Sequence, residues 1–370
     1  MRGVRLLAAA LVLGGAAPAA PLAARPAAPP RMNDIQVVGS HNSFKARIPA
    51  PVMAAIRQRS APLAEALDYY HLPLAQQLDR GVRQLEIDIF ADPTGGRFAD
   101  PAGEAIARAA GVRTGFDRAA MLRPGFKVLH IPDIDYLSNC GATLAQCLGQ
   151  VNAWSRAHPG HAPIMITLNA ADTPQPGDRT ERVPLDNPAL LDALDAEIRR
   201  AIPGRRLIVP AEVLGTAPSL AQAVRTGGWP SLRAARGRIY ILFDVRPAVS
   251  EAYRAGHPDL RGRAMFGWYP DDDRDAAVEI VQDPLAEGAR IRHLVEQGVI
   301  VRTRTDANTV EARAHDRHKA EAAYASGAQA VSTDYYPGAP DPLGLGYRLQ
   351  LPGDRMERPN PVRRPEAGRR

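Results

Sequence analysis

The chain has 370 residues, of which 45% are hydrophobic and 23% are charged, and its formal net charge is +6 at pH 7. This length and apolar content allow one large domain or two medium ones. Most of the excess positive charge lies in Arg2, Arg5 and an arginine-rich segment over residues 354–370. The rest of the chain is close to neutral, which argues against nucleic-acid binding.

Residues 1–24 have the pattern of a signal peptide. Arg2 and Arg5 precede an apolar segment over residues 6–15, and small residues suited to cleavage follow it. The apolar segment is too short to be read as a membrane span. We therefore expect a secreted or periplasmic protein, with an uncleaved leader as the alternative.

Short apolar runs alternate along the chain with segments of helical periodicity. The alternation predicts eight strands, over residues 35–44, 84–90, 126–130, 163–169, 238–244, 264–269, 299–305 and 328–334. Helices are expected between them, over residues 51–80, 144–158, 188–201, 284–298 and 309–326.

Strands that mostly alternate with helices predict an α/β fold, here a parallel (β/α)8 barrel of the TIM type over residues 33–340. A doubly wound open sheet is the alternative. Nearly every predicted strand ends in polar or charged residues. In a barrel these carboxyl ends share one mouth, whereas the outer strands of an open sheet end far apart. The pattern therefore favours the barrel. Residues 341–370 are rich in Pro and Arg and have no hydrophobic period, so we expect a disordered tail.

Two carboxylates lie at alternate positions of the second predicted strand. Glu86 and Asp88 share one face of this strand, and the apolar residues beside them share the other. Two neighbouring carboxylates in a buried strand are costly unless a cation lies between them. A hard divalent metal such as Ca²⁺ or Mg²⁺ accepts such oxygen ligands. Ion pairs with nearby arginines are the alternative.

The other strand-end residues suit phosphodiester chemistry. His41 and His130 could act on opposite sides of a phosphodiester, one at the phosphoryl oxygen and one at the leaving group. Asn42 can add a carbonyl oxygen to a hard cation, which would neutralise developing charge. Arg302 or Arg304 can hold a phosphate in bidentate fashion.

Charged residues at the ends of the later strands allow two interpretations. Arg302, Arg304 and Asp334 could bind substrate at the barrel mouth. Alternatively these three residues and Asp244 could form an ion-pair network that closes this end of the barrel.

Cys140 and Cys147 are the two cysteines of the chain. In an exported protein, such a close pair favours a local disulfide, and two free thiols are the alternative. A bond between them would hold one loop and would not connect distant parts of the fold.

Several segments form a set when they are taken in order along the chain. They are Gly39–Phe44, Gly81–Asp88, Lys127–His130, Val301–Asp306 and Ser326–Tyr335. Together with the cysteine pair, they resemble the phosphatidylinositol-specific phospholipase C family, and in particular its bacterial calcium-dependent branch. The resemblance extends from about residue 34 to residue 337, which is nearly all of the predicted mature chain.

The resemblance implies a distorted barrel that binds Ca²⁺ and cleaves phosphatidylinositol in a lyase-like first step. The inositol 2-hydroxyl attacks phosphorus, which releases diacylglycerol and a cyclic inositol phosphate. By this resemblance, His41 stabilises the charged phosphoryl group and His130 is the general acid to the leaving oxygen. Asn42, Glu86 and Asp88 hold Ca²⁺, and Glu86 helps to deprotonate the 2-hydroxyl.

One residue departs from the family pattern. The family has a carboxylate at the end of the fourth strand, where this chain has Asn169. A neutral ligand should weaken Ca²⁺ binding, because affinity follows the charge of the ligands. Asp172 or another loop residue is a candidate to compensate.

Two other functions compete with this one. A glycerophosphodiester phosphodiesterase uses a related barrel, but Arg-Gly follows its first histidine, whereas Asn42 and Ser43 follow His41 here. A non-catalytic barrel that binds inositol phosphates is the second alternative, and Asn169 supports it. We expect a phospholipid or other phosphodiester substrate and transient contact with a membrane surface, while the oligomeric state is left open. Aromatic residues considered for this contact are Trp229, Phe266, Trp268 and Tyr269.

Overall fold

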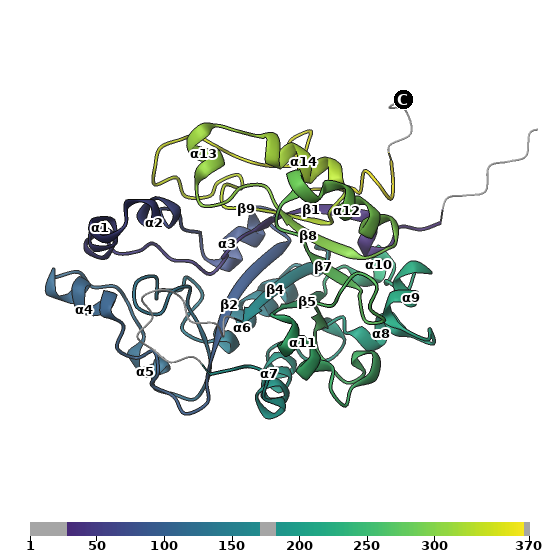
Figure 1. The fold of residues 1–370 in the computed structure, drawn as a ribbon, viewed down its shortest axis with the longest axis horizontal. Coiled ribbons are helices and arrows are strands. Elements are labelled where there is room, and N and C mark those ends of the chain that lie inside the picture. The colour runs from purple at the N-terminus through teal and green to yellow at the C-terminus, as the bar shows by residue number, and fades with distance from the viewer. Residues whose placement is uncertain (1–27, 171–182, 366–370) are drawn as a thin grey trace, which may run out of the picture.

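A computed structural model of the protein describes residues 28–170 and 183–365 (Figure 1). The predicted leader and Asp172 lie outside the described residues. Within the described ranges, no helix is both long and apolar enough to cross a membrane.

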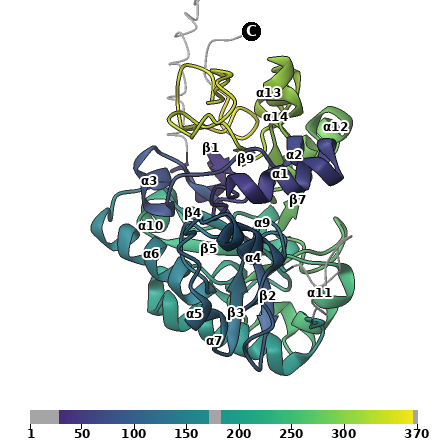
Figure 2. The same ribbon diagram turned by 90° about the vertical axis from the view of Figure 1, so that its left-hand side faces the viewer.

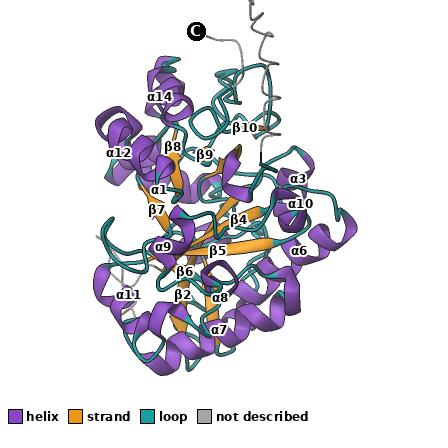
Figure 3. Cartoon of the chain, turned by 90° about the vertical axis from the view of Figure 1, so that its right-hand side faces the viewer, coloured by secondary structure: helices purple, strands orange, loops and turns teal. Residues whose placement is uncertain are grey.

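Eight parallel strands form a nearly closed barrel, with helices between them. The strands follow the order β6-β5-β4-β2-β1-β9-β8-β7, so the opening lies between β6 and β7. Figure 3 shows the strands in the middle of the molecule with helices around them. The predicted (β/α)8 barrel is confirmed and the open sheet is not. The barrel strands are β1 (Ile35–Ser40), β2 (Gln84–Asp92), β4 (Ile164–Ala170), β5 (Ile239–Asp244), β6 (Phe266–Gly267), β7 (Val278–Ile280), β8 (Ile300–Arg304) and β9 (Ala330–Thr333).

One predicted barrel strand has a different place in the structure. The run over residues 126–130 contains β3 (Gly125–Val128), which pairs antiparallel with the last residues of β2 and lies off the barrel path. An apolar run does not encode whether its partner is parallel or antiparallel, so the sequence pattern could not separate these cases. The missing barrel strand is β7, whose three residues are too few to show a period.

The helices match the expected positions but are more often interrupted. The region 51–80 forms three helices, because Ser60 caps the second helix and prolines stand at the helix starts. The region 309–326 forms two helices, which are separated at His315 in a left-handed conformation. The helices are α1 (Ala50–Arg59), α2 (Ala61–Ala66), α3 (Leu74–Asp79), α4 (Ala102–Ala109), α5 (Arg118–Met121), α6 (Leu144–Ala157), α7 (Pro188–Ala201), α8 (Pro210–Leu214), α9 (Leu220–Arg225), α10 (Leu232–Ala235), α11 (Pro247–Arg254), α12 (Pro284–Glu296), α13 (Val310–Ala314) and α14 (His318–Ser326).

The two faces of β2 explain how the barrel is filled. Leu85, Ile87 and Ile89 are fully buried in the main apolar core. Burying each such side chain stabilises the fold by about 1.5–3 kcal/mol. The opposite face carries Glu86 and Asp88, which point into the barrel, because Glu86 contacts Arg302 of β8. The interior of the barrel mouth is therefore polar, and the apolar residues of β2 lie on the other face.

Cys140 and Cys147 form a disulfide, as predicted. The bond joins the loop before α6 to the first turn of that helix. Thr143 caps α6, because its hydroxyl accepts a hydrogen bond from the backbone of Gln146 at 3.3 Å. The same loop reaches back toward β1, since Asn139 donates to the backbone oxygen of Ser43 at 2.9 Å.

The C-terminal segment packs against the barrel, so the expectation of a disordered tail does not hold for residues 341–365. Its strand β10 (Glu357–Pro359) pairs antiparallel with the start of β1. Tyr347, Leu349 and Leu351 are buried at alternate positions, a short period that the Pro/Arg-rich composition hides. Figure 2 shows this segment in yellow next to β1 and β9.

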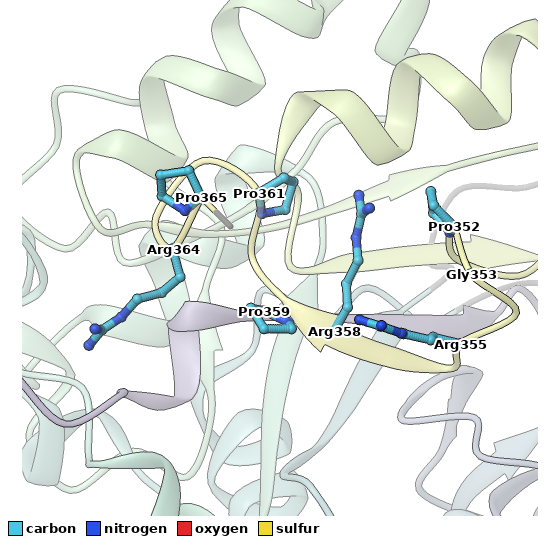
Figure 4. Close-up of a pocket in the computed structure, with 8 residues that line it drawn as sticks. All are labelled: Pro352, Gly353, Arg355, Arg358, Pro359, Pro361, Arg364 and Pro365. Carbon is cyan, nitrogen blue, oxygen red and sulfur yellow. The ribbon is translucent and has the colours of Figure 1, made fainter. Parts of the chain in front are cut away.

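A pocket of about 420 Å³ lies beside β10 (Figure 4). Two of its arginines already have partners. Arg358 donates to Gln36 at 2.9 Å, and Arg364 pairs with Asp34 at 3.2 Å. The pocket borders the amino-terminal part of β1, whereas the predicted site residues follow its carboxyl end. We therefore interpret this pocket as part of the attachment of the tail.

Candidate active site

Most of the predicted site residues lie at or near the carboxyl ends of the parallel strands. His41 and Asn42 follow β1, and Ser43 ties this turn to β2, because its backbone amide donates to the backbone oxygen of Glu86 at 2.9 Å. Asn42 has a φ of 46°, a left-handed conformation that asparagine tolerates better than most residues. Asp88 lies in the middle of β2, the ends of β4, β5 and β8 add Asn169, Asp244 and Arg304, and Asp334 directly follows β9.

His41 is held from both sides of its ring. Its Nδ1 lies 3.2 Å from the Asp334 carboxylate, and its Nε2 lies 3.1 Å from the Arg304 guanidinium. Arginine can only donate, so Nε2 accepts and the proton of the neutral ring is on Nδ1, bonded to Asp334. Arg304 also pairs with Asp334 at 3.4 Å. The predicted ion-pair network at the barrel end is thus confirmed for Arg304 and Asp334.

The charges around His41 favour a neutral imidazole beside an ionised carboxylate. Burial and the neighbouring Arg304 lower the pKa of His41 to about 4. Burial alone would raise the pKa of Asp334, but His41, a hydrogen bond from His71 and the charge of Arg304 hold it well below its ordinary value. Asp334 is therefore a permanent negative charge against Nδ1 of His41.

His71 and Tyr69 are site residues that the sequence analysis missed. The Nε2 of His71 donates to the backbone oxygen of His41 at 2.7 Å and lies 3.4 Å from Asp334. The Tyr69 hydroxyl lies 3.3 Å from His41 Nδ1 and accepts a hydrogen bond from Asn42 at 2.9 Å. Both residues fall in a region expected to be one long helix, where an aromatic or histidine residue gives no signal for a site.

His130 has its own carboxylate. It lies just after β3, so it does not end a barrel strand, and its Nδ1 is 2.8 Å from Asp135. Lys45, which is fully buried, pairs with Asp135 at 2.9 Å. Burial raises the pKa of Asp135, but the charge of Lys45 and the hydrogen bond from His130 outweigh this effect. The net shift of the Asp135 pKa is downward. Asp135 is therefore ionised and holds the Nδ1 proton of His130.

The two histidines belong to one connected network. The Lys45 ammonium lies 5.0 Å from the centroid of the Tyr69 ring, and the Tyr69 hydroxyl contacts His41. The network therefore runs from His130 through Asp135, Lys45 and Tyr69 to His41. Lys45 and Asp135 were missed because a single lysine or aspartate in a loop carries no period or motif.

Glu86 and Asp88 differ in their surroundings. The Arg302 guanidinium donates to Glu86 inside the barrel and to Gln282 at 2.7 Å. Burial raises the pKa of Glu86, but the charge of Arg302 outweighs it, and the net shift is downward. Among the described residues no cation pairs with Asp88, and burial and the charge of Glu86 raise its pKa well above the ordinary range. The predicted alternative, an ion pair with arginine, is thus confirmed for Glu86.

The oxygen atoms of this region fit a hard cation. Asp88 is 4% exposed, and its Oδ1 has no hydrogen-bond partner in the part of the chain that the structure describes. Asn42, Glu86 and Asn169 add oxygen donors of the kind that Ca²⁺ prefers. Among the described residues, no three His, Cys, Asp or Glu side chains converge closely enough to hold a metal in the present arrangement. Binding would therefore draw the carboxylates together.

The residues predicted to bind substrate have different exposures. The Arg302 side chain is fully buried beneath Glu86, whereas the Arg304 side chain is 12% exposed. Arg304 is thus the better placed of the two to meet a phosphate. Of the aromatic residues considered for membrane contact, Trp229, Phe266 and Tyr269 are a wrong choice, because they are buried. Trp268 is partly exposed and stays a prediction.

Comparisons with known proteins match the chain to a protein family and to solved structures. A family model described as "Phosphoinositide phospholipase C, Ca2+-dependent" matches residues 30–361. No curated protein sequence is similar enough to match the chain.

Solved structures of bacterial enzymes share the fold. A calcium-dependent phosphoinositol-specific phospholipase C from the Gram-negative bacterium Pseudomonas sp. has 15% identity and a TM-score of 0.55, over 89% of this chain and 95% of that one. The same figures hold for its myoinositol complex. A Ca²⁺-dependent phosphatidylinositol-specific phospholipase C from Streptomyces antibioticus has 18% identity and a TM-score of 0.52, over 86% of this chain and 98% of that one. The family match extends over most of the chain, and the protein therefore belongs to the Ca²⁺-dependent phosphoinositide phospholipase C family.

Proposed function

We propose that the protein is a Ca²⁺-dependent phosphodiesterase that cleaves phosphatidylinositol to diacylglycerol and a cyclic inositol phosphate. The observation that carries this proposal is the pair of histidines, His41 and His130, each bonded through Nδ1 to a buried carboxylate in one network. Family membership supports a phosphodiesterase, and the two fixed imidazoles supply the acid–base groups that it needs.

His130 is the general acid of the proposed reaction. Its Nδ1 is bound to Asp135, so Nε2 is the atom left to carry the transferred proton. The ionised Asp135 stabilises the imidazolium form, which gives its proton to the glycerol oxygen as the bond from phosphorus to that oxygen breaks. The neutral ring can then take a proton from water if the cyclic product is hydrolysed.

His41 and Arg304 hold the phosphoryl group. They lie side by side at the barrel mouth, with Arg304 12% exposed, and Asp334 fixes both. A phosphate oxygen arriving here would meet the Arg304 guanidinium. The negative charge of the phosphate, together with ionised Asp334, would favour a proton on His41 Nε2, so that both side chains donate to the phosphoryl group in a fixed orientation.

The carboxylates provide the base and the ligands for Ca²⁺. Bound Ca²⁺ would neutralise charge on the phosphoryl group, and Asn42, Glu86, Asp88 and Asn169 would hold it. The proton of the 2-hydroxyl passes to a carboxylate of the Glu86 and Asp88 pair. Arg302 lowers the pKa of Glu86, so Glu86 alone is a weak base.

The test is product analysis with matched histidine variants. Mature protein with phosphatidylinositol vesicles should release a cyclic inositol phosphate, detected by ³¹P NMR. His41→Ala and His130→Ala should each lower kcat by at least about 10²-fold, as expected for loss of a general acid or a transition-state contact. His318→Ala is the matched control, because that side chain is 83% exposed on α14.

Other products would select the competing functions. Release of glycerol phosphate would identify a glycerophosphodiester phosphodiesterase. Binding of inositol phosphate without turnover at any Ca²⁺ concentration would identify a non-catalytic barrel. Equal activity of the wild type and both site variants would contradict the proposed roles of the histidines.

We also propose that the protein is exported and acts at a phospholipid surface. The signal-peptide pattern of residues 1–24 supports export, and the phospholipid substrate of the proposed reaction supports surface contact. Amino-terminal sequencing of protein recovered outside the cytoplasm should begin after Ala20 to Ala24. A mature protein that begins at Met1 would contradict this proposal.

A further inference from the structure

Three residues on neighbouring strands form a row across the barrel mouth. Asp88 of β2 lies opposite Asn169 of β4, and Asn169 lies opposite Asp244 of β5. All three strands are parallel, so residues in the same register share a face of the sheet.

The shared face is the inside of the barrel. Two residues before Asp88, Glu86 contacts Arg302 across the barrel. Gln84, two residues before Glu86, donates to the side chain of Thr167, which lies two residues before Asn169. Side chains alternate along a strand, so Asp88 and Asn169 point inward, and the register carries Asp244 to the same side.

The row contains a buried oxygen without a partner. Asp88 is 4% exposed, Asn169 donates a hydrogen bond to it, and its Oδ1 has no partner among the described residues. Asp244 is partly buried, and in the described ranges no hydrogen bond or ion pair engages its carboxylate. Asn169 thus lies between two carboxylates that form no ion pair with the described residues.

We propose that Asp244 supplies the third carboxylate of the Ca²⁺ site, in place of the carboxylate that Asn169 lacks. This inference rests on the calcium dependence in the proposed function. Asn169 would contribute its neutral amide oxygen between Asp88 and Asp244. Arg302 strengthens the need for such a residue, because its charge offsets that of Glu86.

The reach of the two side chains allows this arrangement. Two strand spacings separate Asp88 from Asp244, which is about 10 Å between Cα atoms. Each aspartate oxygen lies about 3.5 Å from its Cα, and two Ca–O bonds add about 5 Å. The combined reach of about 12 Å exceeds the span. One cation can therefore touch both carboxylates with only rotation of side chains.

The experiment measures Ca²⁺ binding itself, by calorimetry on the folded protein without lipid. Asp244→Asn should weaken Ca²⁺ binding at least about tenfold, because affinity follows the number of charged ligands. Adding Asn169→Asp to that variant should restore most of the loss, since it moves the carboxylate one strand along the same row. Asp272→Asn, in an exposed loop, is the matched control and should bind as the wild type does.

Several outcomes would overturn the inference. Unchanged affinity in Asp244→Asn, together with lost binding in Asp88→Asn, would show a site without Asp244. The inference would also fail if Asp244→Asn lost Ca²⁺ binding with an unchanged thermal unfolding midpoint and adding Asn169→Asp did not restore the binding. So would a wild type that binds no Ca²⁺ at about 10 mM, well above the range of weak extracellular calcium modules. Normal Ca²⁺ binding without phosphatidylinositol cleavage would instead contradict only the proposed function.

Discussion

The Nδ1 of His41 lies 3.2 Å from the carboxylate of Asp334, which joins the carboxyl ends of β1 and β9. These strands are adjacent in the barrel although the two residues are far apart in sequence. The contact fixes which nitrogen of His41 carries the proton. Several expected outcomes depend on this and related contacts.

Replacing Asp334 with Asn should impair the reaction while the fold is kept. An amide can donate to Nδ1 of His41 and favour the wrong tautomer, a change that can cost about 10²–10⁴-fold in kcat. Steady-state kinetics on phosphatidylinositol should show this fall in kcat with a smaller change in KM. Asp316→Asn, at a partly exposed aspartate near α14, is the control. A kcat within twofold of the wild type would refute the role of the contact.

Removing the positive charge of Lys45 should destabilise the protein. Lys45→Met leaves the buried Asp135 without its cation, which should lower the free energy of unfolding by about 3–5 kcal/mol. Denaturant unfolding of this variant, of Asp135→Asn and of the double variant forms a double-mutant cycle. The double variant should recover part of the loss. Strict additivity of the two changes would mean that Lys45 and Asp135 are not coupled.

Opening the disulfide should loosen the loop beside the site. Replacing both Cys140 and Cys147 with serine should lower the free energy of unfolding by about 2–3 kcal/mol, from the entropy of the short loop that the bond closes. Activity should fall too, because Asn139 in this loop holds the backbone of Ser43 next to the site. Unfolding and kinetics that match the wild type would show that the bond carries neither role.

Glu279 should make the stability depend on pH. Its side chain is buried on β7, where Trp268 donates to it at 3.0 Å. Burial and the charge of Asp271 raise its pKa to about 8, above the ordinary value of 4.5. The folded state thus holds a proton that the unfolded state has released. The stability contributed by this group is complete below pH 4.5 and is lost as the pH rises through 8.

Glu279→Gln removes this titration. As the pH rises from 4.5 to about 8, the wild type should lose stability relative to the variant. The difference in the free energy of unfolding should grow by up to about 1.4 kcal/mol per pH unit. Glu287→Gln, at a partly exposed partner of Arg290, is the matched control, and its difference in unfolding free energy from the wild type should stay constant with pH. A pH-independent difference for Glu279→Gln would rule out a raised pKa.

The sequence predicted the barrel, and it pointed to most of the candidate residues at the barrel mouth, because both leave local patterns. Strand ends such as Glu86 with Asp88, or His41 with Asn42, combine an apolar run with polar residues at its end. The antiparallel pairing of β3, the short β7 and the packed tail leave no such pattern, since they depend on partners far along the chain.

The partners of the histidines could not be predicted for the same reason. Asp135, Lys45 and His71 are single polar residues in irregular segments, and only the folded chain shows which of them meet. The pairing of Arg302 with Glu86 was open as one of two alternatives, because the sequence does not say which arginine crosses the barrel.

The most direct test of the proposed function is the initial rate of phosphatidylinositol cleavage by the mature protein as Ca²⁺ is titrated into an EGTA-buffered assay, with His130→Ala in parallel. We predict release of a cyclic inositol phosphate that rises with Ca²⁺, stops in EGTA and is lost in the variant. Cleavage that persists in EGTA at the full rate would contradict the calcium dependence. Full activity of His130→Ala would contradict the mechanism.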